Sequence, residues 1–440
     1  MDIEIAAVGG YEEVGRNMTA VRVGDDVVVF DMGLDVAPVV REGLDVEHAG
    51  RRELIDAGAI PDDSVVADLD GEVCAIVFSH GHLDHVGAAG VLAERYDAPL
   101  IASPFTMELL KGELDPGYDG DLVTMAAGEV TTLGDDLDLE FVHVTHSIVG
   151  AVNPVLHTPH GAIVYGLDKR LDHDPVLEPP IDMARFVELG EAGVLAYVED
   201  CTNAGRSGRT PGEAVARARV RDVLGSVADA SGVIVASTFA SHVARVSSIV
   251  EAAEEIGREP LLLGRSMATY ARTAAHFGYP GFGDVEAHGT RVGIERALRR
   301  VRTEGRDSFL LLTTGHQGEP NAVLPRLAHG DGAFALGTDD VVVFGARVIP
   351  DPINRRQRAT LDRRLARREI EVHEDVHVSG HLSDAGHRRM RRTLEPRTLI
   401  PAHQSVGGIE RYVALAEADG YERGEDVHVA RNGTIIQLSS

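Results

Sequence analysis

Six consecutive residues, His80-Gly81-His82-Leu83-Asp84-His85, bring three imidazoles and one carboxylate close together in the chain. Imidazole nitrogens and carboxylate oxygens are the ligands that a borderline metal such as zinc takes in proteins. An apolar run at 73–78 precedes these residues and a helix-like segment at 88–96 follows them, which predicts a strand, a tight loop and a helix. Gly81 and Gly87 are expected to bend the backbone so that the polar side chains converge. A histidine-rich surface loop is the alternative, but it does not explain the position directly after a buried strand.

Further metal ligands are expected where other strands end, because ligands gather at the carboxyl ends of strands. A closed site for two metal ions needs about three ligands beyond this loop. Four polar residues directly follow or lie just behind predicted strands: Asp31, His146, Asp168 and His403. Each alone fits a solvated loop residue, and only their shared placement supports a joint role.

The first third of the chain is dense in short apolar or alternating segments, which are typical of strands. The predicted strands are 3–8, 19–23, 27–30, 73–78, 138–144, 151–157 and 162–166. Few helices interrupt them, so we expect two sheets packed face to face with helices outside. The segment 34–63 has weak periodicity and is expected to be a long excursion over one face.

Beyond residue 205 the pattern changes to helices that alternate with short strands, which predicts a parallel sheet. Helical spacing covers 211–228, 240–256 and 266–277, and strands are predicted at 233–236, 261–263, 309–313 and 341–344. After residue 372 we expect a strand at 376–379, a helix at 383–394, a strand at 399–401, a helix at 408–418 and a final hairpin ending at Leu438.

The composition predicts a cytoplasmic protein of two or three domains in its 440 residues. No stretch approaches the ~20 apolar residues that span a bilayer, so we expect no membrane association. The N-terminus is acidic and enters a strand at once, unlike a signal peptide. Cys74 and Cys201 are too few for a thiolate cluster or a disulfide framework.

The charge is unusually negative, with a formal net charge of -28 and only two lysines, Lys111 and Lys169. A carboxylate-rich, lysine-poor surface resembles the proteins of salt-loving organisms. Such a net charge argues against a nucleic-acid partner in dilute buffer. At about 1 M salt, however, the Debye length falls to roughly 3 Å, so the net charge does not exclude a polyanionic substrate.

The residues His80 to His85 carry the HxHxDH signature of the metallo-β-lactamase fold, and the segment beyond residue 205 resembles the β-CASP insertion of nucleic-acid-processing members. More closely, the chain resembles the ribonuclease J family. The short sequence motifs that carry this resemblance lie at 9–10, 14–18, 31–34, 144–148, 200–204, 238–241, 264–267, 317–320, 377–381 and 400–403. The resemblance implies an α/β protein, a metallo-β-lactamase αββα sandwich formed by 1–205 and 373–440, with an inserted β-CASP domain at 206–372.

By that resemblance, two Zn²⁺ ions per chain would be bound, with Mn²⁺ or Mg²⁺ as alternative activating ions. His80, His82, His146 and Asp168 would hold the first ion. Asp84, His85, His403 and the bridging Asp168 would hold the second. Asp31 and Asp200 resemble carboxylates that lie behind the ligands and orient them.

The resemblance also names a substrate-binding segment, His377, Val378, Ser379, Gly380 and His381, which would hold the RNA phosphate. Asp84, His85, Asp168 and His381 would be the catalytic residues. His381 would either protonate the leaving ribose oxygen, since imidazole titrates near neutrality, or only bind phosphate. Arg245 and Arg265 would contact the RNA backbone or be surface charges, and Lys169 is equally well explained by a structural role.

The implied activity is a ribonuclease that degrades single-stranded RNA mainly from 5′-monophosphate ends, with some internal cleavage, in RNA decay and processing that includes rRNA. The alternatives are an endonuclease of the cleavage-and-polyadenylation type, a metal-dependent hydrolase of small esters or thioesters, and an inactive RNA-binding scaffold. The chain ends at Ser440 without the additional C-terminal domain of bacterial members, which fits a shorter archaeal type. A homodimer and contacts with other RNA-decay factors are left open. The sequence departs from the motifs of the family at His316, Gln404-Ser405 and 349–354, and these differences would affect the shape of the RNA channel.

Overall fold

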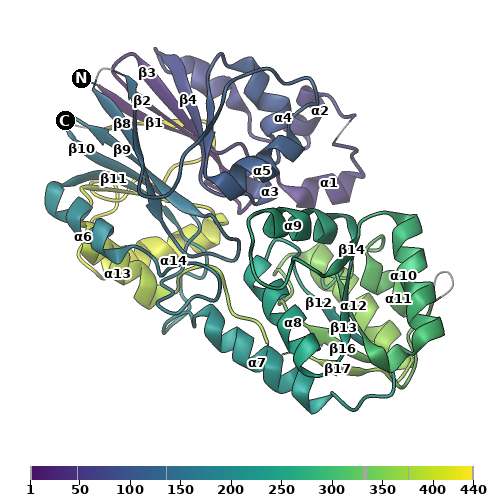
Figure 1. Ribbon diagram of the computed structural model, residues 1–440. Helices are drawn as coiled ribbons and strands as arrows, with labels where there is room; N and C mark the ends of the chain where they lie inside the picture. The colour runs from purple at the N-terminus through teal and green to yellow at the C-terminus, as the bar shows by residue number, and fades with distance from the viewer. Residues whose placement is uncertain (1, 47, 135, 331–333, 375, 439–440) are drawn as a thin grey trace. The chain divides into compact units, whose positions relative to one another are not determined.

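The computed structural model describes residues 2–46, 48–134, 136–330, 334–374 and 376–438. Contacts divide the chain into two compact units (Figure 1). Unit 1 comprises Met1–His173, Pro180–Thr210 and Gly380–Ser440, and unit 2 comprises Asp174–Pro179 and Pro211–Ser379. The boundaries predicted at 205/206 and 372/373 therefore lie near divisions at 210/211 and 379/380, and the short segment 174–179 was not expected in unit 2.

Two mixed sheets form the centre of unit 1. The first has the order β19 (Thr434–Leu438), β1 (Ile3–Gly9), β2 (Met18–Val23), β3 (Asp26–Phe30), β4 (Glu72–Phe78), β5 (Leu100–Ala102) and β6 (Leu122–Thr124). The second has the order β18 (Thr398–Ala402), β11 (Val194–Asp200), β10 (Gly161–Gly166), β9 (Val152–Thr158), β8 (Leu137–His143) and β7 (Val130–Gly134). Every strand predicted between residues 3 and 166 is confirmed to within one residue at either end.

The central strands of unit 1 are apolar because both of their faces are covered, whereas the edge strands β6 and β7 contain no buried residue. In β1, Ile3 and Ile5 enter the core between the two sheets, whereas Ala6 and Val8 enter the core under the first helical layer. That layer consists of α1 (Val36–Glu42), α2 (Arg51–Asp56), η1 (Asp63–Asp68), α3 (Leu83–Val86), α4 (Ala89–Leu92), η2 (Ala93–Arg95) and α5 (Pro104–Glu113). The opposite layer consists of α6 (Met183–Ala192), α13 (Asp384–Leu394) and α14 (Val406–Glu417). The expected αββα sandwich is confirmed.

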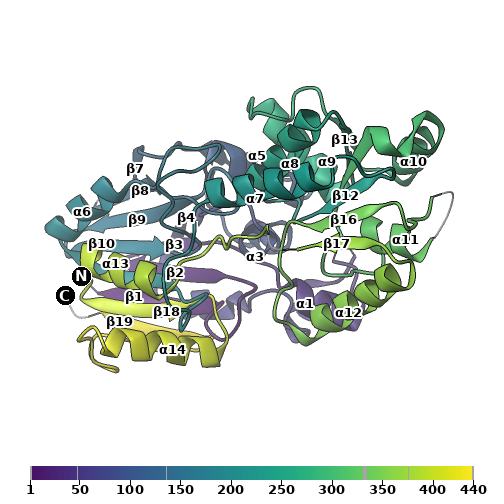
Figure 2. The ribbon, with the colours of Figure 1, turned by 90° about the horizontal axis from the view of Figure 1, so that it is seen from below.

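Unit 2 is built on one parallel sheet, as predicted. Its order is β14 (Glu286–His288), β13 (Glu259–Leu263), β15 (Phe309–Thr313), β12 (Ile234–Ser237), β16 (Val341–Phe344) and β17 (Glu371–His373). The helices are α7 (Glu213–Ser226), α8 (Val243–Glu255), α9 (Arg265–His276), α10 (Arg291–Glu304), η3 (Arg306–Ser308), α11 (Val323–His329) and α12 (Pro352–Arg367). Helices α10 to α12 share one core with the sheet, and Figure 2 shows α7 and α8 on the side away from α12.

Several predicted elements are wrong. The segment 376–379 forms no strand; Val376 and Val378 are buried as its alternation suggested, but the His377 carbonyl accepts from Nη1 of Arg219 instead of a ladder partner. The final strand β19 pairs antiparallel with β1 and not within a C-terminal hairpin. The excursion 34–63 contains α1 and α2, which were not predicted. The helix-like segment predicted at 88–96 is confirmed by α4 and η2, and a further short helix, α3, begins at Leu83.

Among the residues that the structure describes, no helix combines the length and the apolar composition needed to cross a bilayer.

Candidate metal centre

The HxHxDH loop of unit 1 connects β4 to α3. His82 precedes the first turn of α3, so that Asp84 and His85 are carried by the helix and His80 by the loop before it. The expected bend does not require a left-handed glycine at either position, because neither Gly81 nor Gly87 has a positive φ. A Cβ at Gly81 would lie 2.5 Å from Cδ1 of Leu109, so a side chain there would require the Leu109 side chain to move.

A first group of donor atoms consists of His80, His82, His146 and Asp168. Nδ1 of His82 lies 3.0 Å from Nε2 of His80 and 3.3 Å from Nε2 of His146. Oδ2 of Asp168 lies 3.5 Å and 3.3 Å from the same two Nε2 atoms. These separations resemble the edges of a tetrahedron of zinc ligands, which measure about 3.3 Å when each metal–ligand bond is about 2.0–2.1 Å.

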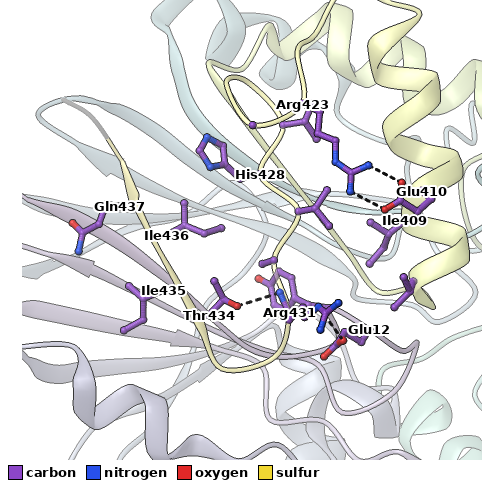
Figure 3. Close-up of a pocket in the computed structure, with 16 residues that line it drawn as sticks. Glu12, Ile409, Glu410, Arg423, His428, Arg431, Thr434, Ile435, Ile436 and Gln437 are labelled. Carbon is purple, nitrogen blue, oxygen red and sulfur yellow. Dashed lines mark hydrogen bonds and ion pairs between the residues drawn. The ribbon is translucent and has the colours of Figure 1, made fainter.

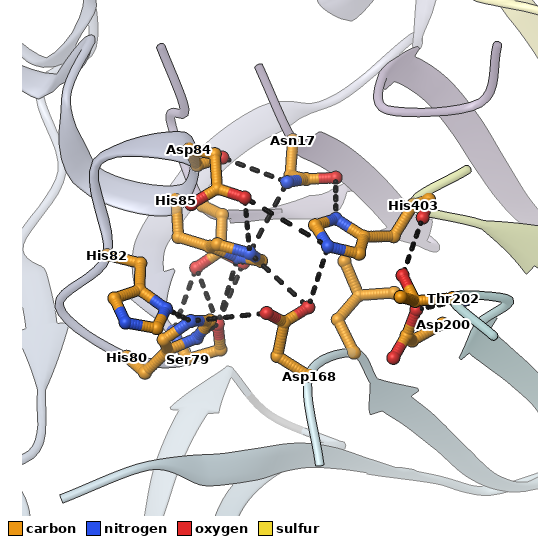
Figure 4. Close-up of polar contacts among 12 residues, drawn as sticks. Asn17, Ser79, His80, His82, Asp84, His85, Asp168, Asp200, Thr202 and His403 are labelled. Atoms are coloured by element: carbon orange, nitrogen blue, oxygen red, sulfur yellow. Dashed lines mark hydrogen bonds and ion pairs between the residues drawn. The ribbon is translucent and has the colours of Figure 1, made fainter. Parts of the chain in front are cut away.

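A second group shares the same aspartate. Oδ1 of Asp168, the other carboxylate oxygen, lies 3.5 Å from Nε2 of His85 and 3.3 Å from Nε2 of His403. Oδ2 of Asp84 lies 3.7 Å and 4.0 Å from these two nitrogens. Figure 4 shows Asp168 reaching both groups, which is the arrangement of a carboxylate that bridges two cations.

The donor set fits metal ions because buried oxygen and nitrogen atoms that carry lone pairs face one another across it. Oδ1 of Asp168 is buried and has no hydrogen-bond partner. Nδ1 of His146 lies 2.9 Å from the Gly380 carbonyl oxygen, which can only accept, so Nε2 is the bare nitrogen of that ring. Several ligand atoms with unshared lone pairs, about 3.3 Å from one another, would repel each other. A cation at their centre removes that repulsion.

Residues behind the ligands hold the two imidazoles of the second group. Nδ1 of His85 donates to Oδ2 of Asp31 at 2.7 Å, and Asp31 also accepts from Ser79 and from the Tyr165 hydroxyl. Nδ1 of His403 lies 3.0 Å from Oδ1 of Asn17. In both rings Nδ1 is the nitrogen held by these residues, so Nε2 faces the metal position; Nδ2 of Asn17 lies 3.3 Å from Nε2 of His85.

Sequence reasoning missed Asn17, Ser79 and Tyr165 as members of this site. Asn17 lies in the motif 14–18, one of those that carry the family resemblance, so this motif could have indicated a role for Asn17. Ser79 is adjacent to His80, and its hydroxyl lies 3.1 Å from His80 Nδ1. Tyr165 sits within β10, and no local pattern distinguishes it from an ordinary core residue.

Three residues of the site have a left-handed backbone conformation, which is disfavoured for residues other than glycine. The φ angles are 58° at Asp31, 26° at Asp168 and 56° at His403. Each residue lies directly after or just behind a strand of the sandwich. The fold thus holds strained residues where the strands end, as functional sites commonly do.

The electrostatics of the first donor group favour deprotonated ligands. Burial lowers the pKa of His80 and of His146 well below the usual value and lowers the pKa of His82 to about 4. Burial would raise the pKa of Asp168, but His403 and His85 outweigh it and hold that pKa well below normal. The second group differs: burial would lower the pKa of His85, but the carboxylates around it, first Asp168, outweigh burial and raise that pKa well above the usual value. The side chains of the first group therefore have the protonation states in which they bind metals, whereas His85 would release a proton when a metal binds.

His381 lies at the edge of this cluster beside Asp200. Its Nδ1 donates to Oδ2 of Asp200 at 2.8 Å, and its Nε2 lies 4.0 Å from Oδ2 of Asp168. Burial would lower the pKa of His381, but the carboxylates of Asp200 and Asp168 outweigh it and raise it to about 9. Asp200 also accepts from the amide of Thr202. The pair therefore presents a protonated imidazole next to the ligands.

The remaining predicted residues are placed individually. His377, Val378 and Ser379 belong to unit 2, whereas Gly380 and His381 belong to unit 1. A Cβ at Gly380 would lie 2.9 Å from the His146 ring, so glycine is required there.

The basic residues singled out from the sequence have different roles. Arg245 is completely buried, pairs with Glu213 at 2.7 Å and donates to the Gly345 carbonyl, so both interpretations, an RNA contact and a surface charge, are wrong. Arg265 is exposed. Lys169 is buried and donates to the Gly166 carbonyl, in agreement with a structural role.

A separate hollow in unit 1 is lined by β19, by residues 423–431 and by one side of α14 (Figure 3). An exposed ion pair, Arg423 with Glu410 at 2.8 Å, lies along it. It contains none of the candidate ligands, so the chemistry belongs to the cluster around Asp168.

Comparisons with known proteins agree with this geometry. Residues 11–172 match the metallo-beta-lactamase superfamily, and residues 231–359 match the ribonuclease J beta-CASP domain. Ribonuclease J of Methanocaldococcus jannaschii is 43% identical over 445 residues, covering 100% of this chain and 99% of that protein. The chain belongs to the ribonuclease J family.

Other members of the family and one solved structure are more distant. Ribonuclease J of Pyrococcus abyssi is 38% identical, with 99% of this chain and 97% of that protein covered. Ribonuclease J of Synechocystis is 29% identical, and 66% of its length is covered. A crystal structure of a protein of unknown function from Enterococcus faecalis V583 covers both chains fully with a TM-score of 0.68 at 18% identity, which supports the fold alone.

Proposed function

We propose that this protein is a zinc-dependent ribonuclease that hydrolyses phosphodiester bonds of single-stranded RNA, mainly from 5′-monophosphate ends and also internally. As a member of the ribonuclease J family, the chain is a metal-dependent hydrolase that acts on RNA, in RNA processing and decay. The observation that carries the finer proposal is the pair of donor groups joined by the two oxygens of Asp168.

In this proposal His80, His82, His146 and Asp168 hold one Zn²⁺, and Asp84, His85, His403 and Asp168 hold the other. Two such ions would lower the pKa of a water molecule and neutralise charge on the phosphoryl oxygens. His82, Asp84 and His381 are the partly exposed members of the cluster, whereas the other ligands are buried, so RNA would approach from their side.

His381 is the candidate for proton transfer. Cleavage that leaves a 5′-phosphate requires a proton on the departing ribose 3′-oxygen. The His381 imidazolium, oriented by Asp200 through Nδ1, can donate that proton from Nε2. The same cation can bind a phosphate oxygen, and the two roles predict different kinetics: a general acid affects the chemical step, whereas a phosphate ligand affects mainly KM.

The test is a time course on RNA labelled at either end, carrying a 5′-monophosphate or a 5′-triphosphate, in concentrated KCl. We expect mononucleotides from the monophosphorylated 5′ end, and loss of activity together with bound zinc in His85→Ala. The matched control is His48→Ala, which removes an exposed histidine in the segment between α1 and α2. Reconstitution with Zn²⁺, Mn²⁺ or Mg²⁺ identifies the activating ion.

Other outcomes would select other functions. Discrete internal cuts that do not depend on the 5′ group would favour the endonuclease of the cleavage-and-polyadenylation type. Intact metal content without RNA turnover would overturn the proposal, and hydrolysis of a thioester would then support the small-substrate hydrolase. The match of residues 231–359 to the beta-CASP domain favours RNA over that alternative.

A further inference from the structure

Helix α12 of unit 2 concentrates positive charge in a chain whose net charge is -28. Its 16 residues, Pro352–Arg367, contain six arginines and a single acidic residue, Asp362. Asp351 caps its N-terminus through the amides of Ile353 and Asn354. The charge balance of this helix is therefore opposite to that of the molecule.

The helical period sorts these arginines onto two faces. Leu361, Leu365 and Arg358 point inward; the leucines enter the core beneath the sheet, and Arg358 pairs with Asp362 and lies over the Phe344 ring. The outward face carries four exposed arginines, separated by Ala359 and Ala366. We call this set the α12 arginine face; its members are Arg355, Arg356, Arg363 and Arg367.

The α12 arginine face has no acidic counterpart. Within the described ranges, no carboxylate lies within 4.0 Å of any of its four guanidinium groups. Some exposed arginines on other helices do have such partners, for example Arg52 with Asp56 and Arg291 with Glu295, whereas Arg296 and Arg299 of α10 have none among the described residues. Like charges four residues apart, such as Arg363 and Arg367, destabilise a helix. Arg367 lies in the last turn, where a cation offsets the helix dipole, but Arg355 and Arg356 lie toward the N-terminus and gain nothing from it.

We propose that the α12 arginine face binds the sugar-phosphate backbone of the RNA substrate, an inference that rests on the proposed function. A guanidinium group is a planar fork that donates two hydrogen bonds to one phosphate. Such direct contacts persist in concentrated salt, where the attraction between distant charges is screened. The alanines between the arginines leave space for a backbone and offer no groups that read bases, so the contact is independent of sequence.

The size of the face suits a polymer. Arg355 and Arg367 are 12 residues apart, which corresponds to about 18 Å along the helix axis at about 1.5 Å per residue. A single phosphate could engage one arginine, whereas a nucleic-acid strand could engage several at once. The face should therefore increase affinity for long RNA more than for short RNA.

The experiment measures binding of fluorescent RNA of about 30 nucleotides, longer than the ~4–16 that one single-strand binding module covers. All proteins carry His85→Ala to prevent cleavage. Arg355→Gln/Arg356→Gln/Arg363→Gln/Arg367→Gln is compared with this parent across KCl concentrations. Glutamine retains helix propensity, and circular dichroism checks folding. A double variant, Arg363→Gln/Arg367→Gln, is compared with a matched control, Arg296→Gln/Arg299→Gln, which replaces two exposed arginines of α10.

We expect the fourfold variant to weaken binding about 10-fold or more and to reduce the slope of log K against log[KCl] by up to about 2.8, about 0.7 for each lost phosphate contact. Hydrolysis of an RNA of about 5 nucleotides by the His85-containing enzyme should not change. An equal loss in the α10 control would overturn the proposal, because it would show a general charge effect. Unchanged RNA affinity with lost self-association would also overturn it, in favour of an acidic surface of a second copy.

The two proposals fail separately. If the unmodified chain does not hydrolyse the short RNA, the proposed function is wrong whatever α12 does. If it does hydrolyse that RNA and the fourfold variant binds long RNA as tightly as its parent, only the inference about α12 is wrong.

Discussion

At the scale of single residues, the carboxylate of Asp31 determines how well the second donor group can bind a metal ion. Asp31 accepts hydrogen bonds from His85, from Ser79 and from Tyr165, so all its neighbours are donors. In Asp31→Asn an amide group would face these donors, and His85 would lose the partner that fixes its tautomer. We expect a 10- to 100-fold loss of metal affinity, measured by competition with a chelator.

Tyr165→Phe is the control for that experiment. It removes one donor to Asp31 but leaves the carboxylate and its bond to His85 in place. Metal affinity close to that of the unmodified protein is expected. If both variants lose metal equally, burial in the core and not orientation of His85 would explain the effect.

A second prediction at this scale concerns pH. The carboxylate of Asp200 is a main cause of the raised pKa of His381, about 9. A general acid works while protonated, so the rate falls as pH rises through this pKa. Asp200→Asn removes the negative charge, and the alkaline limb of the profile of kcat against pH should therefore move to lower pH. Bound cations would lower the His381 pKa in both proteins and so preserve the direction of the difference.

The contrasting result is also informative. If His381 only binds phosphate, Asp200→Asn should raise KM and leave the alkaline limb of kcat where it is. Measurement of kcat and KM separately across pH distinguishes the two roles. A limb that moves to higher pH would contradict the electrostatic account of the His381–Asp200 pair.

The seven candidate ligands could be predicted from sequence because of two signals. His80, His82, Asp84 and His85 are close in the chain, and His146, Asp168 and His403 follow predicted strands. The supporting residues had no such signal: Tyr165 and Asn17 act through contacts across 134 and 386 residues of sequence. Arg245 shows the opposite error, since its charge suggested exposure but Glu213 allows it to be buried.

At the scale of elements, the site depends on how closely the segment after β3 approaches α3. A Cβ at Gly33 would lie 1.7 Å from the carbonyl oxygen of Asp84, while the amide of Gly33 donates to the Asn17 carbonyl. Gly33→Ala must therefore move α3, together with Asp84 and His85. We expect a loss of about 3 kcal/mol or more in the free energy of unfolding, measured in urea, together with weaker metal binding.

Gly112→Ala is the control for this substitution. Gly112 lies within α5, and a Cβ there would meet no atom within 4 Å. Because alanine is the better helix former, this variant should gain about 0.5–1 kcal/mol. Equal stability of Gly33→Ala and the unmodified protein would show that α3 adapts to the added methyl group.

The strands were easier to predict than the helices, for a physical reason. Strands covered on both faces appear as continuous apolar runs, which are visible in the sequence. Helices α1 and α2 are only 7 and 6 residues long, and each buries a single residue, so no periodic pattern exists. In 376–379 the alternation reflected burial, but burial without a neighbouring strand does not make a sheet.

At the scale of the whole molecule, the two-part organisation of unit 1 was predicted from distant motifs and not from local patterns. His403 is more than three hundred residues from His80, and the chain forms a complete parallel α/β unit between them. Only the family resemblance joined these segments. The pairing of β11 with β18, which brings Asp200 and His403 to one edge, could not be read from composition or periodicity.

The last prediction concerns the net charge of -28, which makes the folded state repel itself in dilute buffer. Raising ionic strength from about 0.1 M to about 1 M shortens the Debye length from about 10 Å to about 3 Å. We therefore expect the midpoint of thermal unfolding to rise by several degrees over this range of KCl, as followed by circular dichroism. An uncharged osmolyte is the control, since it favours burial without screening charge. A midpoint that stays constant or falls with KCl would contradict the interpretation of the acidic surface as an adaptation to salt.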